Sequence, residues 1–184
     1  LAISPHGKVP VLKVGDTALF ESNAIAEFLD EVVQPRLHPE DAVERAKHRA
    51  WTDYVPTFSS LLGKITYCKD MADLPAGLDE ARVGLGRLEG ALEKSQASAG
   101  GPLYEGHKLC LVDAAYAPFF QRFGMVEDKL RTNVLDEFPR VKAWVAALAE
   151  HESVNGSVAS SFSIDYIANL QRRGSCAAPL FEAA

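Results

Sequence analysis

The chain has 184 residues, of which 47% are hydrophobic and 24% charged, and its formal net charge is −6. This balance is typical of a folded protein with room for one or two domains. The acidic excess argues against nucleic acid as a partner, because phosphate binding needs a concentrated positive surface. We expect no membrane span, because no stretch approaches the ~18 to 20 apolar residues that one requires. The first residues show no signal-peptide pattern.

The cysteines are few and scattered. Cys68, Cys110 and Cys176 lie far apart and form no Cys-x-x-Cys motif. An odd, sparse set of this kind fits a reducing cytoplasm better than a disulfide framework, so we expect a cytoplasmic protein. The five histidines do not cluster with the cysteines, and we expect no metal site.

A β-hairpin is predicted near the start of the chain. Residues 9–14 (VPVLKV) and 17–20 (TALF) are β-rich runs separated by Gly15 and Asp16. Two residues are enough for a tight turn when glycine supplies the positive φ. Pro10 lies at the beginning of the first strand, where the loss of its N–H does least harm.

A helix follows the hairpin, because apolar residues recur at three- and four-residue spacing over residues 24–32. Ser22 is the expected N-cap, and Pro35 is expected to end the helix. Residues 36–41 are predicted as a linker, which separates a first domain, residues 1–35, from a second, residues 42–184.

The second domain is predicted to be entirely helical. Its apolar residues repeat with helical spacing, and the longest helix contains Pro56 and Gly63 as candidate bend points. The predicted helices cover residues 41–68, 78–96, 112–125, 137–151 and 164–173, with a short turn near Val154.

Two motifs carry a family resemblance. Residues 4–12 (SPHGKVPVL) and 19–25 (LFESNAI) together resemble the glutathione transferase signature NPxGKVPxL…xESxAI in wording and spacing. Residues 103–115, from LYEG to LVDAA, resemble the family's entry into its sixth helix. The resemblance covers essentially the whole chain and looks closest to bacterial, omega-like members. It implies an α/β thioredoxin-like N-terminal domain, present here only as its later half, followed by an all-α helical bundle.

The resemblance also implies a glutathione site. In the family the Val–Pro bond is cis, which would turn the N–H and C=O of Val9 at Pro10 towards the cysteinyl backbone of glutathione, like an added strand. Ser22 would hold the γ-glutamyl carboxylate at a helix start, and Glu21 would receive the ammonium group. Lys8 either attracts the glycyl carboxylate or is a solvated loop lysine. The alternative to a ligand-binding role is purely structural. Pro10 would then only begin an edge strand, Ser22 would only cap the helix, and Glu21 would only be a favourable charge in its first turn.

Three residues of the second domain were assigned further roles. Asp113 stands in the family's Ser/Thr-x-x-Asp cap, where Cys110 replaces the hydroxyl residue and puts one capping bond in question. Tyr54 and Tyr116 are candidates for a pocket that receives a small electrophile, against the alternative of a plain hydrophobic core.

The resemblance places the catalytic side chain upstream of Leu1. Since the sequence begins with leucine and residues 1–4 already read as part of a structured segment, we expect a preceding strand-helix-strand that carries a Cys, Ser or Tyr, with Cys favoured by the omega-like resemblance. The three cysteines present do not lie between a strand and a following helix, so none is assigned as nucleophile.

The expected function follows from the same resemblance. It is a glutathione-dependent transferase or thiol-transferase in detoxification, acting on a small electrophile or mixed disulfide with glutathione as co-substrate and working as a homodimer. The alternatives are a non-catalytic binding module and a redox-inert helical stress protein.

Overall fold

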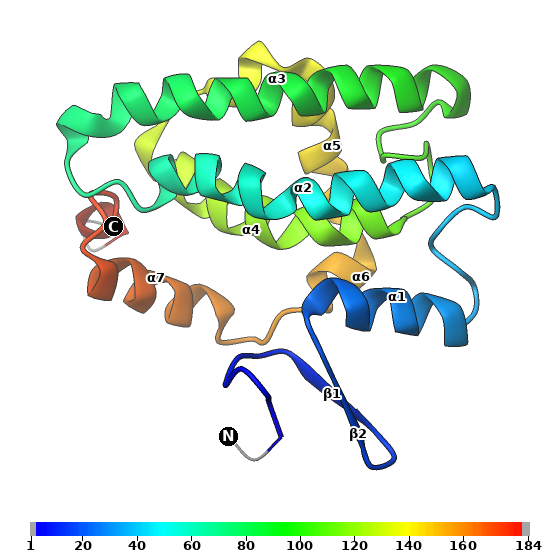
Figure 1. Cartoon of the computed structure of the whole chain (residues 1–184). Coiled ribbons are helices and arrows are strands. Elements are labelled where there is room, and N and C mark those ends of the chain that lie inside the picture. Colours follow the sequence, from blue (N-terminus) through cyan, green and yellow to red (C-terminus); the bar gives the residue numbers. More distant parts are fainter. Residues whose placement is uncertain (1–2, 182–184) are drawn as a thin grey trace. The chain divides into compact units, whose positions relative to one another are not determined.

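The computed structural model describes residues 3–181, so Leu1, Ala2 and residues 182–184 lie outside it. The chain divides into two compact units, with the boundary between Asp53 and Tyr54. The first unit holds strands β1 (Val11–Val14) and β2 (Thr17–Phe20), helix α1 (Ser22–Val32) and the beginning of α2 (Ala42–Thr66), which continues into the second unit (Figure 1).

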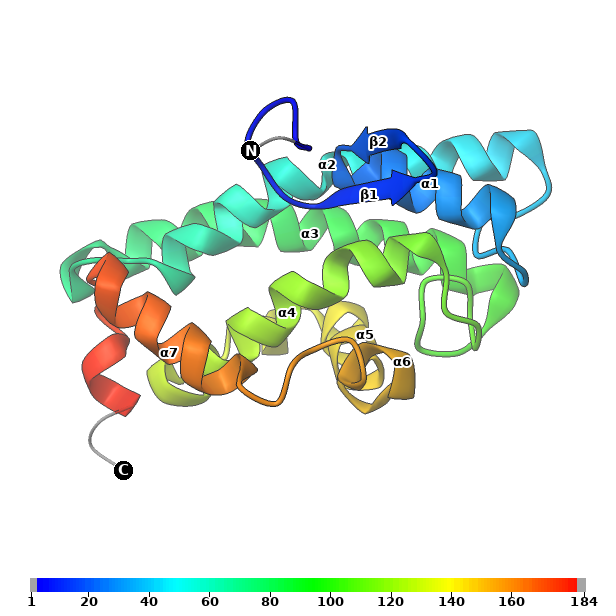
Figure 2. The same ribbon diagram turned by 90° about the horizontal axis from the view of Figure 1, so that it is seen from below.

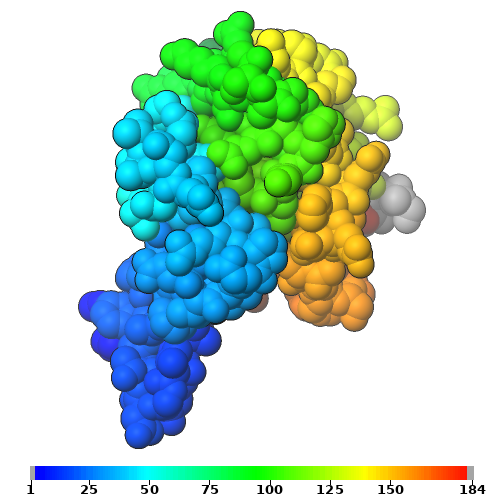
Figure 3. Space-filling model, turned by 90° about the vertical axis from the view of Figure 1, so that its right-hand side faces the viewer, coloured from blue at the N-terminus to red at the C-terminus, as the bar shows by residue number. Residues whose placement is uncertain are grey.

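The hairpin has the predicted two-residue turn. β1 and β2 are antiparallel, and Val14 pairs with Thr17, so Gly15 and Asp16 alone form the loop. Gly15 has a φ of 58°, as this turn requires. The first strand begins at Val11 rather than at residue 9, because Val11 already pairs with Phe20, the last residue of β2. In the space-filling view the hairpin, in dark blue, stands out from the lighter blue α1 of the same unit (Figure 3).

Helix α1 begins differently from the prediction. Glu21, not Ser22, is the N-cap residue; its φ is 68°, and no side chain caps the helix. The serine is instead the first helical residue, because the first helical bond runs from the N–H of Ile25 to the carbonyl of Glu21. The predicted end is confirmed, since the helix stops at Val32, shortly before Pro35.

Polar contacts connect α1 to the segment that follows it. Asp30 Oδ1 accepts hydrogen bonds from the backbone N–H of Leu37 at 2.5 Å and of His38 at 3.2 Å. The Glu27 carboxylate contacts His38 Nε2 at 2.7 Å and pairs with Arg49 of α2. The arginine hydrogen bond, with the histidine contact, holds the pKa of Glu27 below its ordinary value despite partial burial.

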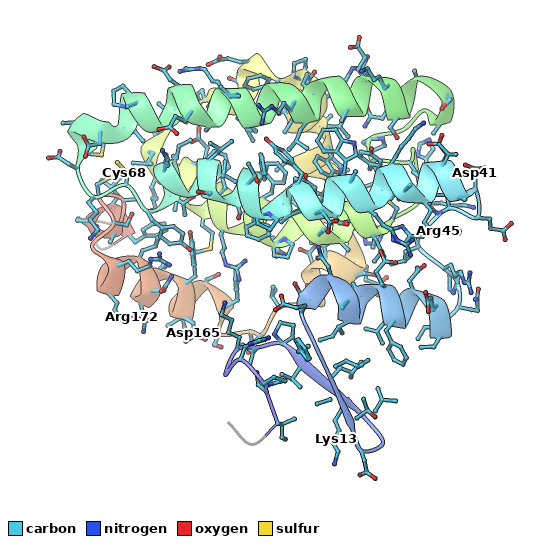
Figure 4. The ribbon with its side chains drawn as sticks, in the orientation of Figure 1. Lys13, Asp41, Arg45, Cys68, Asp165 and Arg172 are labelled. Carbon is cyan, nitrogen blue, oxygen red and sulfur yellow. The ribbon has the colours of Figure 1, made fainter. Side chains whose placement is uncertain are left out.

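Helix α2 is capped by the residue that the sequence predicted as its first. Asp41 Oδ1 accepts from the N–H groups of Val43 and Glu44, both at 2.9 Å, so the helix begins at Ala42. Arg45 donates back to the carbonyl of Glu40 at 3.1 Å (Figure 4). The Asp41 carboxylate therefore satisfies two of the N–H groups that lack a partner within the helix.

The second unit is helical, as predicted, and the four later predicted helices are confirmed with shifted ends. The predicted turn near Val154 is a short helix. After α2, the second unit contains the following α-helices and 3-10 helices (η) in chain order: η1 (Met71–Asp73), α3 (Leu74–Ala99), α4 (Leu111–Leu130), η2 (Val134–Glu137), α5 (Pro139–Glu150), α6 (Glu152–Asn155), α7 (Phe162–Arg173) and η3 (Ala178–Phe181). Among residues 3–181, none of the helices combines the length and hydrophobicity that a bilayer crossing requires.

An aromatic cluster forms the centre of the second unit, where α5 packs against both α3 and α4 (Figure 2). The rings of Phe58, Tyr116, Phe120 and Trp144 lie with centroids 5.2–5.6 Å apart. Such tilted and edge-on pairs add to the free energy gained from burial alone.

Asp113 organises the start of α4 from within this core. Its side chain is fully buried and accepts from the N–H of Tyr104 at 2.9 Å, the N–H of Cys110 at 2.8 Å and Trp144 Nε1 at 2.6 Å. The reciprocal bond of the capping box, from the Asp113 N–H to the Cys110 side chain, is also present. The thiol therefore takes the place of the usual hydroxyl.

Candidate functional site

A small cleft of about 70 Å³ lies in the first unit, where the loop before β1 meets the end of β2 and the start of α1. We call it the Val9–Ser22 cleft. It brings together all five residues that the sequence assigned to a ligand site, namely Lys8, Val9, Pro10, Glu21 and Ser22, and adds Ser4, His6 and Phe20 to its lining.

The Val9 backbone is available to a ligand. The Val9–Pro10 peptide bond is cis, as expected. Val9 is 90% exposed, and among residues 3–181 neither its N–H nor its C=O has a backbone partner. One backbone donor and one backbone acceptor are therefore unpaired just before the start of β1, and an extended peptide could pair with them.

The start of α1 forms the opposite end of the cleft. The N–H groups of Ser22, Asn23 and Ala24 precede the first helical hydrogen bond, and no side chain caps them. Unpaired N–H groups at the positive end of a helix dipole favour a bound carboxylate, and the Ser22 hydroxyl lies beside them. Glu21 adopts a φ of 68°; non-glycine residues rarely adopt this left-handed region, and backbone strain of this kind recurs at binding sites.

A side chain from α2 supports this helix start. Asn23 Nδ2 donates to Asp53 Oδ1 at 3.0 Å, within the first unit. This exposed contact joins the first turn of α1 to α2 and so helps to orient the unpaired N–H groups of the helix start.

Ser4 orders the loop on the other side of the cleft, and the sequence prediction missed it. Its hydroxyl donates to the Lys8 carbonyl at 2.7 Å and accepts from the Lys8 N–H at 3.0 Å. His6, which had no predicted role, packs edge-on against Phe20 with ring centroids 5.3 Å apart. A serine before a proline-containing turn was the available signal, because its hydroxyl commonly binds nearby backbone groups.

The two tyrosines predicted for an electrophile pocket lie in different surroundings. Tyr116 is fully buried in the aromatic core, so the prediction that it lines an open pocket is corrected. Burial also raises the pKa of its hydroxyl. Tyr54 is half-buried, and its hydroxyl accepts from Arg87 Nη1 at 2.9 Å; it keeps its place as a candidate.

A larger cavity, of about 510 Å³, lies in the second unit between α4, α7 and the segment before α7. Arg122 lines it, donating to the Pro118 carbonyl at 2.7 Å and facing the Phe162 ring at 5.8 Å. None of the predicted site residues lines this cavity. Within residues 3–181, no group of three or more His, Cys, Asp and Glu side chains is arranged to hold a metal ion.

The sequence of this chain is similar to that of a known protein family. The model of the glutathione S-transferase N-terminal domain matches residues 1–32. A probable glutathione S-transferase of Nicotiana tabacum is 30% identical over 155 residues, which cover 83% of this chain and 68% of the relative. Glutathione S-transferase omega-1 of Rattus norvegicus is 29% identical over 164 residues, which cover 88% of this chain and 63% of the relative.

A solved structure agrees with the fold. The tau class glutathione S-transferase of Mangifera indica matches with a TM-score of 0.75 at 23% identity, covering 90% of this chain and 77% of that one. The chain belongs to the glutathione S-transferase family. Its hairpin and α1 lie within the residues that the N-terminal-domain model matches, and its second unit is helical. It spans 68% and 63% of the lengths of the tobacco and rat relatives.

Proposed function

We propose that the Val9–Ser22 cleft binds glutathione, and that the chain is the larger part of a glutathione-dependent transferase or thiol-transferase acting on a small electrophile or a mixed disulfide. The observation that supports it most is the pairing, in one cleft, of an open backbone donor and acceptor at Val9 with the uncapped helix start at Ser22. A tripeptide with a free carboxylate matches both features.

The bound tripeptide would use the cleft along its length. Its cysteinyl backbone pairs with Val9 like an added strand, and its γ-glutamyl carboxylate lies at the Ser22 N–H and hydroxyl. Glu21 receives the neighbouring ammonium group. Lys8 attracts the glycyl carboxylate or stays solvated, and both alternatives remain open.

The thiol of glutathione is then activated as a thiolate. Each unit by which its pKa falls corresponds to about 1.4 kcal/mol of stabilisation. The omega-like resemblance favours Cys as the activating side chain, which would form a mixed disulfide with glutathione. Tyr54 is the remaining candidate for contact with the electrophile.

Substitution of Ser22 tests the binding proposal. Ser22→Ala removes a hydroxyl bonded to a carboxylate but keeps the N–H, so we expect glutathione affinity, measured by calorimetry, to fall about tenfold. Ser161→Ala is the matched control, since Ser161 also stands at a helix start, that of α7, and is exposed in the second unit. Equal affinity of Ser22→Ala and wild type would refute the assignment of this cleft.

A non-catalytic binding module is the second candidate. The observation that favours it is that none of the three cysteines lines the Val9–Ser22 cleft. Glutathione binding without turnover of either a model electrophile or a mixed disulfide would establish this candidate over the enzyme.

We further propose a cytoplasmic homodimer that serves detoxification, with domains at residues 1–35 and 42–184 joined by the linker 36–41. Exposed apolar side chains in the first unit, Val32, Val33 and Val43, support burial against a second copy. Sedimentation equilibrium is expected to give twice the monomer mass; a monomer at every concentration would contradict the dimer.

A further inference from the structure

Two cysteines that are distant in sequence meet at one end of the second unit. Cys68 follows the end of α2, and Cys176 lies between α7 and η3. The Cys176 N–H donates to the Cys68 carbonyl at 2.7 Å, and Ser175 Oγ donates to the Thr66 carbonyl at 3.0 Å. Figure 4 labels Cys68 at the end of α2, and Figure 1 shows the C-terminal segment, in red, beside it.

The geometry permits a disulfide between them. A hydrogen bond between the two backbones limits the Cα atoms of Cys68 and Cys176 to less than about 7 Å apart, and disulfides span roughly 4.4–6.8 Å. The two thiols are also near enough to interact, since the Cys68 thiol contributes to the raised pKa of Cys176. Both are free thiols in this structure.

Cys176 is more accessible to solvent than Cys68, so Cys176 should react first. Cys68 is only 6% exposed, and its Sγ donates to the Asp70 carbonyl at 2.9 Å. Cys176 is half-buried and can meet a small molecule from solvent. The third cysteine, Cys110, is 1% exposed inside the α4 capping box and has neither access nor a partner thiol.

We propose that Cys68 and Cys176 form a redox-active pair that small disulfides convert into an intramolecular disulfide. The Cys176 thiolate attacks one sulfur of the small disulfide, forms a mixed disulfide and expels a small thiolate, which takes up a proton. The Cys68 thiolate then attacks the Cys176 sulfur, the mixed bond breaks, and the second small thiol leaves. The two cysteines lose two electrons and two protons in all, and the small disulfide gains both.

The local environment makes this disulfide slow to form and persistent. Burial and the neighbouring Cys68 thiol raise the pKa of Cys176 to about 11. A thiol with so high a pKa is seldom ionised at neutral pH, but it is also a poor leaving group once bonded. The pair therefore suits a lasting oxidised form rather than rapid catalytic cycling.

The bond would fasten the C-terminal segment to α2. That segment is already packed through buried Ala177 and Ala178 against Val126 and Leu170, with Tyr67 and Phe181 at the edge of the cluster. A disulfide between Cys68 and Cys176 would close a long loop and so restrict the unfolded chain. The oxidised form should therefore unfold at a higher temperature and resist proteolysis after residue 170.

The test is oxidation of the wild-type chain with bis(2-hydroxyethyl) disulfide, which carries no glutathione groups, so its result is independent of the Val9–Ser22 cleft. Mass spectrometry is expected to show loss of two hydrogen atoms, no retained adduct, and a peptide cross-link between Cys68 and Cys176. Three free thiols after treatment, or a lasting adduct on Cys176 without the cross-link, would overturn the proposal.

Serine variants test the order of steps. Cys68→Ser should keep the mixed disulfide on Cys176, because the resolving thiol is gone, whereas Cys176→Ser should gain almost no adduct, because Cys68 is buried. Cys110→Ser is the matched control and should oxidise like wild type. Cross-linking through Cys110 in any of these proteins would contradict the assignment.

Discussion

Single hydroxyl and carboxyl groups hold two loops of this chain in place. Ser4 bonds both backbone groups of Lys8, and Asp113 gathers two backbone N–H groups and the indole of Trp144. Only the second was predictable from the sequence, because it belongs to a recognisable capping motif. The bonds of Ser4 to Lys8 depend on the conformation of the loop between them, which the spacing of residues in the sequence does not predict.

Ser4→Ala should loosen the loop beside Val9. A lost hydrogen bond of about 1 kcal/mol predicts roughly fivefold weaker glutathione binding by calorimetry, while Ser4→Thr, which keeps the hydroxyl, should stay near wild type. Ser59→Ala removes a comparable exposed hydroxyl-to-carbonyl bond on α2 and serves as the control. If Ser4→Ala binds glutathione as tightly as wild type, the hydrogen bonds of Ser4 to Lys8 do not contribute to binding in the Val9–Ser22 cleft.

Asp113→Ala should destabilise the second unit strongly. It leaves the Tyr104 N–H, the Cys110 N–H and the Trp144 indole buried without their acceptor, so we expect a loss of at least about 3 kcal/mol in urea unfolding. Cys110→Ser should change stability by less than about 1 kcal/mol, because a hydroxyl suits the same capping box. A small effect of Asp113→Ala would show that the carboxylate is not what orders the start of α4.

At the scale of elements, hydrophobic periodicity located the helices, but their ends depended on local chemistry that periodicity does not report. α3 begins at Leu74, four residues early, because the 3-10 turn η1 leads directly into it with Pro75 in its first turn. α4 runs on to Leu130, where Arg131 adopts the left-handed conformation that ends it. Tyr116 shows a related limit: helical spacing assigns it to one face of α4 but does not distinguish a pocket from the core, and the structure buries it in the core.

The contact between α2 and α3 supplies a test at this scale. A Cβ on Gly77 would lie 3.0 Å from the Lys64 carbonyl oxygen, a backbone atom that cannot move aside alone, whereas Gly90 has nothing within 4 Å. Gly77→Ala should therefore lower the free energy of unfolding by about 1–3 kcal/mol, and Gly90→Ala should raise it by up to about 1 kcal/mol. Equal effects of the two alanines in urea unfolding would contradict close helix packing at Gly77.

At the scale of the whole molecule, the sequence predicted the class of fold and the five residues that meet in the cleft, because a family signature fixes both types and spacing. It did not predict the network around Glu27, since the contacts with His38 and Arg49 join residues 11 and 22 positions apart. Such contacts depend on how α1 and α2 meet, which no local pattern encodes.

That network predicts an acid sensitivity. Because the pKa of Glu27 lies below its ordinary value of 4.5, its contribution to stability is present above pH 4.5 and is lost as the pH falls through the lowered pKa. Glu27→Gln should therefore be less stable than wild type at pH 7, and the difference in the free energy of unfolding should shrink as the pH falls below 4.5 in urea unfolding. Glu31→Gln, on the same helix without the Arg49 hydrogen bond, is the control; a stability difference for Glu27→Gln that stays constant as the pH falls below 4.5 would contradict this account.

The most direct test of the central claim is a glutathione titration of the chain followed by backbone amide shifts in two-dimensional NMR. The account predicts that the largest saturable shifts occur at Val9, Ser22 and Asn23. Shifts concentrated instead at Arg122 and its neighbours in the larger cavity, or none at the Val9–Ser22 cleft, would contradict it.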